Sequence, residues 1–121
     1  MVEIRALPGR ERLVMVFKGQ LDEAELEDAE EELREALKQV APAFDMISDV
    51  SEAEKLSPQA VERIRRMGQL IVDAGLRTHV RVVGRSSQPA LQFQRISRSV
   101  GYDSRLAYSL AEAEGLLDGP P

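Results

Sequence analysis

The 121-residue sequence contains no cysteine and only one histidine, His79. Without cysteine the chain has no disulfides, no thiolate nucleophiles and no cysteine–zinc sites. The lone histidine opens an apolar run, which favours a strand-boundary residue over a catalytic base, because a base needs a nucleophile and an orienting group beside it. We therefore expect no enzyme activity, no metal site and no cofactor.

Long apolar runs are also missing, the longest being Leu13–Phe17, which is too short to cross a membrane. The first residues lack the basic segment and apolar stretch that mark export, so we expect a cytoplasmic protein. Aromatic residues make up only 4% of this acidic chain, and no nucleic-acid-binding signature occurs in it. This composition argues against a nucleic acid as partner.

What remains is 43% hydrophobic and 31% charged residues, the composition of an ordinary globular chain. The length fits one domain with a single modest core. We predict that this domain covers residues 1–118 and that residues 119–121 form a flexible tail.

The net charge of −5 is unevenly distributed along the chain. Residues 1–62 hold 7 Lys+Arg and 16 Asp+Glu, whereas residues 63–121 hold 9 Arg and 5 Asp+Glu. We interpret the carboxylates that crowd the first predicted helix as a solvated face rather than as acid–base groups. One explanation of this charge asymmetry is an acidic helix and a basic helix that each face solvent. The alternative is a weak homodimer, in which oppositely charged halves of two chains attract each other and which salt dissociates.

The first part of the chain predicts a hairpin followed by a helix. Alternating or β-branched apolar residues predict strands over residues 2–7 and 13–18, joined by a type II turn at Pro8-Gly9. Asp22, with Glu25 three residues later, predicts a capping box that opens a helix ending before Pro42.

The rest of the chain alternates predicted strands with predicted helices. Short apolar runs predict strands over residues 44–50, 79–84 and 105–109. Start and stop signals predict helices from Ser57 to Gly75, from Pro89 to Gly101 and from Ser109 through Leu117. The resulting β-β-α-β-α-β-α-β-α order predicts an α/β fold, with a mixed sheet of four to five strands and helices packed over it.

Three stretches carry a resemblance to a known family: GQLD at residues 19–22, FDMISDVSEAEKLSP at 44–58 and YSLAEAEGLL at 108–117. Together with the element order, they resemble the STAS domain, the fold shared by bacterial anti-sigma-factor antagonists and sulfate-transporter tails. The resemblance implies a STAS-like protein-binding module in bacterial regulation, with an anti-sigma factor or a kinase-like regulator as partner.

The resemblance also implies a switch, a phosphorylatable serine in an Asp-Ser-Ser-Gly-like stretch at the start of the second helix. In this chain that stretch falls on Ser57, Pro58, Gln59 and Ala60, and none of the four keeps the family residue. Ser57 is the nearest hydroxyl and the one candidate phosphoacceptor, but a serine before proline is commonly only a helix cap. We therefore expect partner binding without the usual switch.

Connections that follow parallel strands meet at one edge of the sheet. We predict a partner surface there, with Asp22, Glu52, Glu54, Ser57 and Arg85 as its polar contacts.

A small-ligand-binding protein is the alternative. The loop Gly84–Pro89 precedes a helix and lacks the second glycine and the lysine of a P-loop. It could still hold a nucleotide, an anion or a lipid head with the help of nearby arginines, namely Arg81, Arg85, Arg95 and Arg98.

Overall fold

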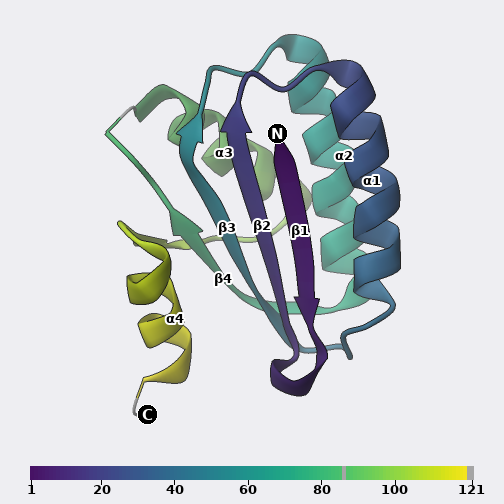
Figure 1. Ribbon diagram of the computed structural model, residues 1–121, viewed down its shortest axis with the longest axis vertical. Helices are drawn as coiled ribbons and strands as arrows, with labels where there is room; N and C mark the ends of the chain where they lie inside the picture. Colours follow the sequence, from purple (N-terminus) through teal and green to yellow (C-terminus); the bar gives the residue numbers. More distant parts are fainter. Residues whose placement is uncertain (86, 120–121) are drawn as a thin grey trace.

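The computed structural model describes residues 1–85 and 87–119 and has the predicted α/β order (Figure 1). Its one sheet has the strand order β1-β2-β3-β4-β5, with β1 antiparallel to β2 and the other neighbours parallel. The elements are β1 (Val2–Leu7), β2 (Arg12–Gly19), α1 (Glu23–Leu37), β3 (Phe44–Ala53), α2 (Pro58–Ala74), β4 (Leu76–Val82), α3 (Ser87–Val100), β5 (Arg105–Ala107) and α4 (Leu110–Asp118). The predicted mixed sheet with an antiparallel first strand is confirmed.

The hairpin at the start of the chain differs from the prediction only in its turn. A short 3-10 helix, Pro8–Arg10, connects β1 to β2, and Glu11 after it adopts a left-handed conformation with φ 48°. The predicted type II turn at Pro8-Gly9 is therefore wrong. Proline at the first position of a 3-10 turn fits this geometry equally well, because its fixed φ suits both conformations.

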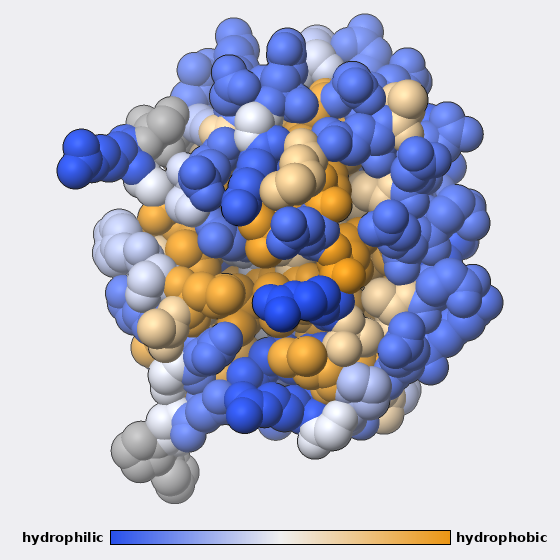
Figure 2. All heavy atoms as spheres, in the orientation of Figure 1, coloured by the Kyte–Doolittle hydropathy of each residue, from blue (hydrophilic) through white to orange (hydrophobic). Residues whose placement is uncertain are grey.

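Helices cover the two faces of the sheet unequally. Helices α1, α2 and α3 pack on one face of the sheet, and α4 packs on the other, at the lower left of Figure 1. Figure 2 views the α4 face and shows apolar side chains gathered across its middle, between polar ones. The buried residues of this face include Val14, Ile47 and Val80, which are neighbours in register on three strands. Both faces are therefore apolar, as in parallel sheets that are covered on both sides.

The larger core lies between the sheet and helices α1, α2 and α3. Its fully buried side chains include Leu26 and Leu33 of α1, Phe44 and Met46 of β3, and Met67 of α2. Ile64 of α2 is 6% exposed and belongs to the same core. The face of α2 that carries Ile64 and Met67 is thus the buried one.

The acidic and basic helices lie beside each other, and part of their charge is paired within the chain. Glu30 of α1 is 6% exposed, and its carboxylate lies 3.3 Å from Arg34, 3.5 Å from Arg66 and 3.9 Å from Arg63. Arg63 and Arg66 belong to α2, so these contacts bridge the two helices. Some of the charge asymmetry that suggests a homodimer is therefore used in folding, and the homodimer itself stays a prediction.

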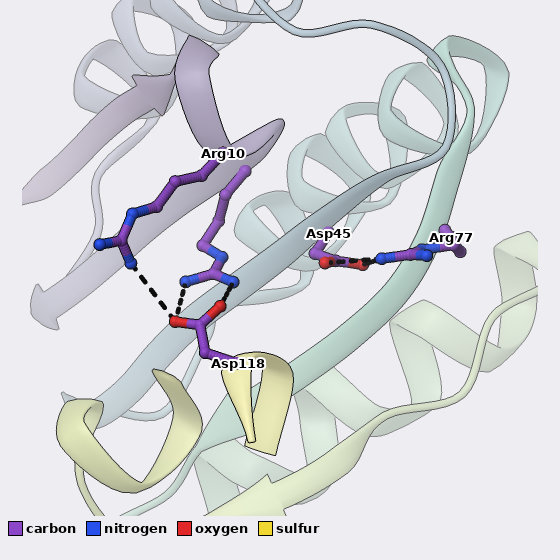
Figure 3. A network of polar contacts seen from close by, with 5 residues as sticks. Arg10, Asp45, Arg77 and Asp118 are labelled. Atoms are coloured by element: carbon purple, nitrogen blue, oxygen red, sulfur yellow. Dashed lines mark hydrogen bonds and ion pairs between the residues drawn. The ribbon is translucent and has the colours of Figure 1, made fainter. Parts of the chain in front are cut away.

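A second set of ion pairs joins the end of α4 to the hairpin formed by β1 and β2 (Figure 3). The guanidinium of Arg12, which is 3% exposed, donates to both carboxylate oxygens of Asp118 at 2.5 and 3.1 Å, and Arg10 donates at 3.3 Å. These donors lower the pKa of the Asp118 carboxyl, chiefly through the hydrogen bond from Arg12. Asp45, opposite Arg12 in the sheet, is held by Arg77 at 3.0 Å.

Several predicted boundaries are shifted for local reasons. Gly75 adopts a left-handed conformation with φ 105°, which ends α2 and returns the chain to the sheet at once, so β4 begins at Leu76 rather than at residue 79. Strand β3 runs on to Ala53 because Ala53 still pairs with Gly19 of β2. The last strand ends at Ala107, because Ser109 already caps α4.

Of the predicted tail, Gly119 forms the C-cap of α4, and residues 120–121 lie outside the described residues. The extent of the domain and the flexibility of the tail therefore stay predictions. None of the helices in the described part of the chain combines the length and the apolar character needed to cross a membrane.

Replacing Ile64 by alanine is expected to destabilise the protein by about 2–5 kcal/mol, because the substitution leaves a cavity under α2. The exposed neighbour Glu62→Ala is the control and should change the free energy of unfolding by no more than about 0.5 kcal/mol. Chemical denaturation of both variants measures the difference. Equal stability of the two variants would contradict the buried face assigned to α2.

Candidate functional site

Strands β2, β3 and β4 all run toward the edge of the sheet that leads into α1, α2 and α3, which is the upper edge in Figure 1. Two backbone contacts join the segments there. The Glu54 amide donates to the Gly19 carbonyl at 3.1 Å, and Gly84 packs directly on the Ser51 carbonyl. The structure thus brings the turn after β2, the segment after β3 and the start of the loop after β4 to one edge.

The turn between β2 and α1 is built by helix capping. Asp22 has an extended backbone, and its carboxylate accepts from the Glu25 amide at 2.8 Å. The Glu25 side chain does not complete the predicted capping box, because its carboxylate pairs with the N-terminal amine of Met1 at 3.1 Å. Leu21 is 6% exposed and anchors the turn in the core. Asp22 is therefore exposed at a fixed position.

The segment between β3 and α2 is also held by its own side chains. Asp49 accepts from the backbone amide and the hydroxyl of Ser51, at 2.9 and 2.6 Å. Ser57 caps α2 by accepting from the Ala60 amide at 3.1 Å, and Pro58 occupies the first helical position. The cap interpretation of Ser57 is confirmed, while its role as a phosphoacceptor stays a prediction.

Asp22 and Ser57 line one hollow of about 470 Å³, which we call the helix-start pocket. Its polar lining residues are Gln20, Asp22, Glu23, Lys55, Ser57 and Gln59. Glu54 is exposed beside the turn, close to Gly19, and Glu52 lies 3.8 Å from Lys18. Four of the five predicted contact residues therefore fall on or near one surface.

Arg85 is the exception among the predicted contact residues. It is exposed and lines a different hollow of about 260 Å³ between β4, α3 and β5, which we call the β5 groove. Residues that line the β5 groove include Arg81, Arg85, Leu91, Gln94, Leu106 and Tyr108. Arg95 and Arg98, which are predicted to assist a ligand near Gly84–Pro89, are exposed on α3 and do not line it.

A buried hydrogen-bonded chain centred on His79 is not predicted by the sequence. The His79 ring is 3% exposed, with Nε2 2.6 Å from the Ser48 hydroxyl and Nδ1 2.5 Å from the Ser104 hydroxyl. The Tyr102 ring packs edge-on against the imidazole, with the two ring centroids 5.2 Å apart. The interpretation of His79 as a strand-boundary residue is wrong, because β4 begins three residues earlier.

Ser48 and His79 have the spacing of a nucleophile and a base, but their surroundings favour a structural role. Both are buried, and the cavity beside Ser48 has a volume of about 20 Å³, room for roughly one water molecule. Burial, with the nearby Arg81 cation adding to its effect, places the pKa of His79 well below its ordinary value. A neutral imidazole has one donor and one acceptor, which the two serine hydroxyls satisfy.

Arg81 is the second buried polar group beneath α3. It is 2% exposed, and its Nη2 donates to the Phe93 carbonyl at 3.3 Å and to the Ser97 hydroxyl at 3.2 Å. Its Nε has no partner among the described residues. Burial lowers the pKa of the guanidinium, which shows how unfavourable the site is for an uncompensated charge.

The fold that frames this edge occurs in solved structures. The unphosphorylated form of the anti-sigma factor antagonist SpoIIAA matches with a TM-score of 0.68 and 20% identity, over 100% of this chain and 99% of that chain. The phosphorylated form of the Bacillus cell fate determinant SpoIIAA matches with a TM-score of 0.58 and 17% identity, over 97% and 99%.

A third solved structure is an uncharacterized protein of the DUF3478 family with a SpoIIAA-like fold, from Shewanella loihica PV-4. It matches with a TM-score of 0.72 and 16% identity, over 97% of this chain and 92% of that chain. No protein-family model and no curated protein matches the sequence. The protein therefore has a STAS-like fold of the SpoIIAA type, which confirms the expectation drawn from the three sequence stretches.

The pKa of His79 predicts a pH dependence of stability. Because the pKa is lower in the folded than in the unfolded state, the unfolded chain binds the proton first as pH falls below about 6.5. The free energy of unfolding should therefore fall between pH 7 and pH 5 more steeply for the wild type than for His79→Asn. Denaturation at both pH values measures this, with Ser104→Ala, which keeps the histidine, as control. Parallel pH profiles of the wild type and His79→Asn would show that His79 is not buried in neutral form.

Proposed function

We propose that this protein is a non-enzymatic, cytoplasmic regulatory module of bacteria that binds a protein partner through the edge formed by Asp22, Glu52, Glu54 and Ser57. Arg85, across the Gly84–Ser51 contact, is an outer contact of the same surface. The partner is an anti-sigma factor or a kinase-like regulator. Support for this class comes from the fold shared with SpoIIAA, an anti-sigma factor antagonist.

The observation that carries the proposal is the shared pocket of Asp22 and Ser57. The two residues cap different helices and are 35 positions apart, yet both line the helix-start pocket. Each is held by a hydrogen bond to its own helix, at 2.8 and 3.1 Å, so both side chains have fixed positions on this surface. A polar surface held on a rigid scaffold is a common basis for recognition.

The charge of this surface indicates the chemistry of the partner. Four exposed carboxylates surround this edge, those of Asp22, Glu23, Glu52 and Glu54. Two lysines, Lys18 and Lys55, lie among them. A partner that presents arginines and lysines complements this pattern, and such an interface associates more slowly at high salt. Glu54 lies next to the Gly19 turn, and its side chain is exposed.

The proposal includes binding without a phosphorylation switch. Pro58 follows Ser57 directly, and Gln59 and Ala60 take the place of the serine-containing stretch of the family. The Ser57 hydroxyl is engaged in capping α2. The start of a helix is an electrostatically favourable place for a phosphate. Ser57 is therefore the residue at which the absence of a phosphorylation switch is tested.

Capture on the immobilised protein followed by mass spectrometry identifies the partner, and charge reversal then tests the surface. Glu54→Lys should weaken partner binding strongly, because it replaces an exposed carboxylate with a cation facing a basic partner. Glu114→Lys is the matched control: it makes the same change at an exposed position of α4, on the other face, and should bind normally. Equal binding by both variants would place the interface elsewhere.

The switch is tested with Ser57→Ala and Ser57→Asp. The alanine variant loses the cap and should be less stable by about 0.5–2 kcal/mol, with unchanged affinity in the folded protein. Ser109→Ala, which removes the cap of α4, is the stability-matched control. The aspartate variant still caps and should bind normally. Selective loss of partner binding by Ser57→Asp, with its stability intact, would establish a switch at this serine.

A further inference from the structure

The fold buries one positive charge without a negative partner. Among the described residues, no Asp or Glu forms an ion pair with Arg81, although the other buried arginine, Arg12, binds Asp118. The hydrogen bonds of Arg81 go to neutral oxygens of α3, and its Nε has no described partner. A buried guanidinium in such a site is costly unless an anion joins it.

The position of Arg81 in the sheet relates it to the β5 groove. Met15, Ser48, Arg81 and Leu106 are neighbours in one row across β2, β3, β4 and β5. This row faces the α3 side of the sheet, because Arg81 donates to α3. On the β5 side the row ends in Leu106, which is 51% exposed and lines the β5 groove together with Arg81.

The remaining walls of the β5 groove are apolar or neutral, apart from one cation. Leu91 of α3 is 47% exposed and Tyr108 is 73% exposed, both large apolar side chains left open to solvent. Gln94 adds an amide and Arg85 a second guanidinium, and none of the lining residues that the structure describes is acidic. The groove therefore combines a buried charge with an exposed apolar surface, and its lining residues are separate from those of the helix-start pocket.

We propose that the β5 groove binds a small monocarboxylate with an apolar body, its carboxylate directed to Arg81 and its body packed on Leu91 and Leu106. One carboxylate matches the single buried positive charge, and it can accept a charge-assisted hydrogen bond from the guanidinium, whose Nη2 is engaged by α3 but whose Nε has no described partner. The volume of about 260 Å³ lies just below the range of roughly 300–1,000 Å³ for drug-sized ligands, which limits the ligand to a short chain or one ring. This site lies apart from the helix-start pocket and shares only Arg85 with the proposed partner surface.

The proposal is tested by NMR titration with four probes that separate the head from the body. Octanoate carries both parts, acetate only the carboxylate, 1-octanol only the apolar body, and inorganic phosphate a different anion. Octanoate should bind saturably, shift the amides of residues 81–85, 90–94 and 105–108, and bind at least about tenfold more tightly than each other probe. Shifts confined to other regions, no saturable binding, or phosphate binding as tightly as octanoate would overturn the proposal.

Variants assign the two halves of the site. Arg81→Met removes the charge and Leu106→Asp places a carboxylate beside it; both should weaken octanoate binding by at least about tenfold. Arg95→Met, a change at an exposed position of α3 outside the groove, should bind like the wild type. If Arg81→Met fails to fold, the exposed position 106 carries the test. Unchanged octanoate affinity in Leu106→Asp would overturn the proposal.

Two further measurements separate ligand binding in the β5 groove from self-association and from partner binding. Amide shifts in the groove that grow with protein concentration alone would show that a second copy of the chain occupies it, which would also overturn the proposal. Glu54→Lys, which tests the partner surface, should leave octanoate binding unchanged. Loss of octanoate binding in that variant would contradict an independent site, whatever the outcome for the partner.

Discussion

The close approach of Gly84 to Ser51 is the contact on which the functional edge depends. A Cβ atom at position 84 would overlap the Ser51 carbonyl oxygen, more closely than real Cβ atoms approach, and would lie 3.2 Å from two backbone carbons of Ser51. Only glycine lets the end of β4 pack this tightly on the end of β3. On one side of this contact the chain continues to Ser57 and the helix-start pocket; on the other, Gly84 and Arg85 border the β5 groove.

The elements of this fold were predictable because their signals are local. The caps Asp22, Ser57 and Ser109 each accept the expected backbone amide, and the mixed sheet followed from the hairpin and the alternation of strands and helices. These signals also located Asp22 and Ser57, which the structure brings to one pocket. Cap residues mark the starts of helices, and starts of helices meet at one edge of a parallel sheet.

The buried polar groups could not be predicted in the same way, because burial depends on what covers a strand. In the run HVRVVG, His79 and Arg81 alternate with Val80 and Val82, which ordinarily indicates a solvated face opposite a buried one. Here α3 covers the polar face, and Ser48, Ser97 and Ser104 supply the hydrogen bonds from distant parts of the chain. The position of Arg85 in the β5 groove was unpredictable for a related reason. The sequence predicts that the loops after parallel strands share one edge of the sheet, but it does not predict on which side of the Gly84–Ser51 contact a given side chain lies.

The contact between Gly84 and Ser51 is tested most directly by Gly84→Ala, with Gly115→Ala as control because position 115 has open space around it. The added methyl group at position 84 should destabilise the protein by about 1–3 kcal/mol. It should also shift backbone amide resonances both in residues 51–60 and along the β5 groove, whereas the control shifts only α4. Wild-type stability of Gly84→Ala, with amide shifts limited to its immediate neighbours, would contradict a contact that positions both surfaces.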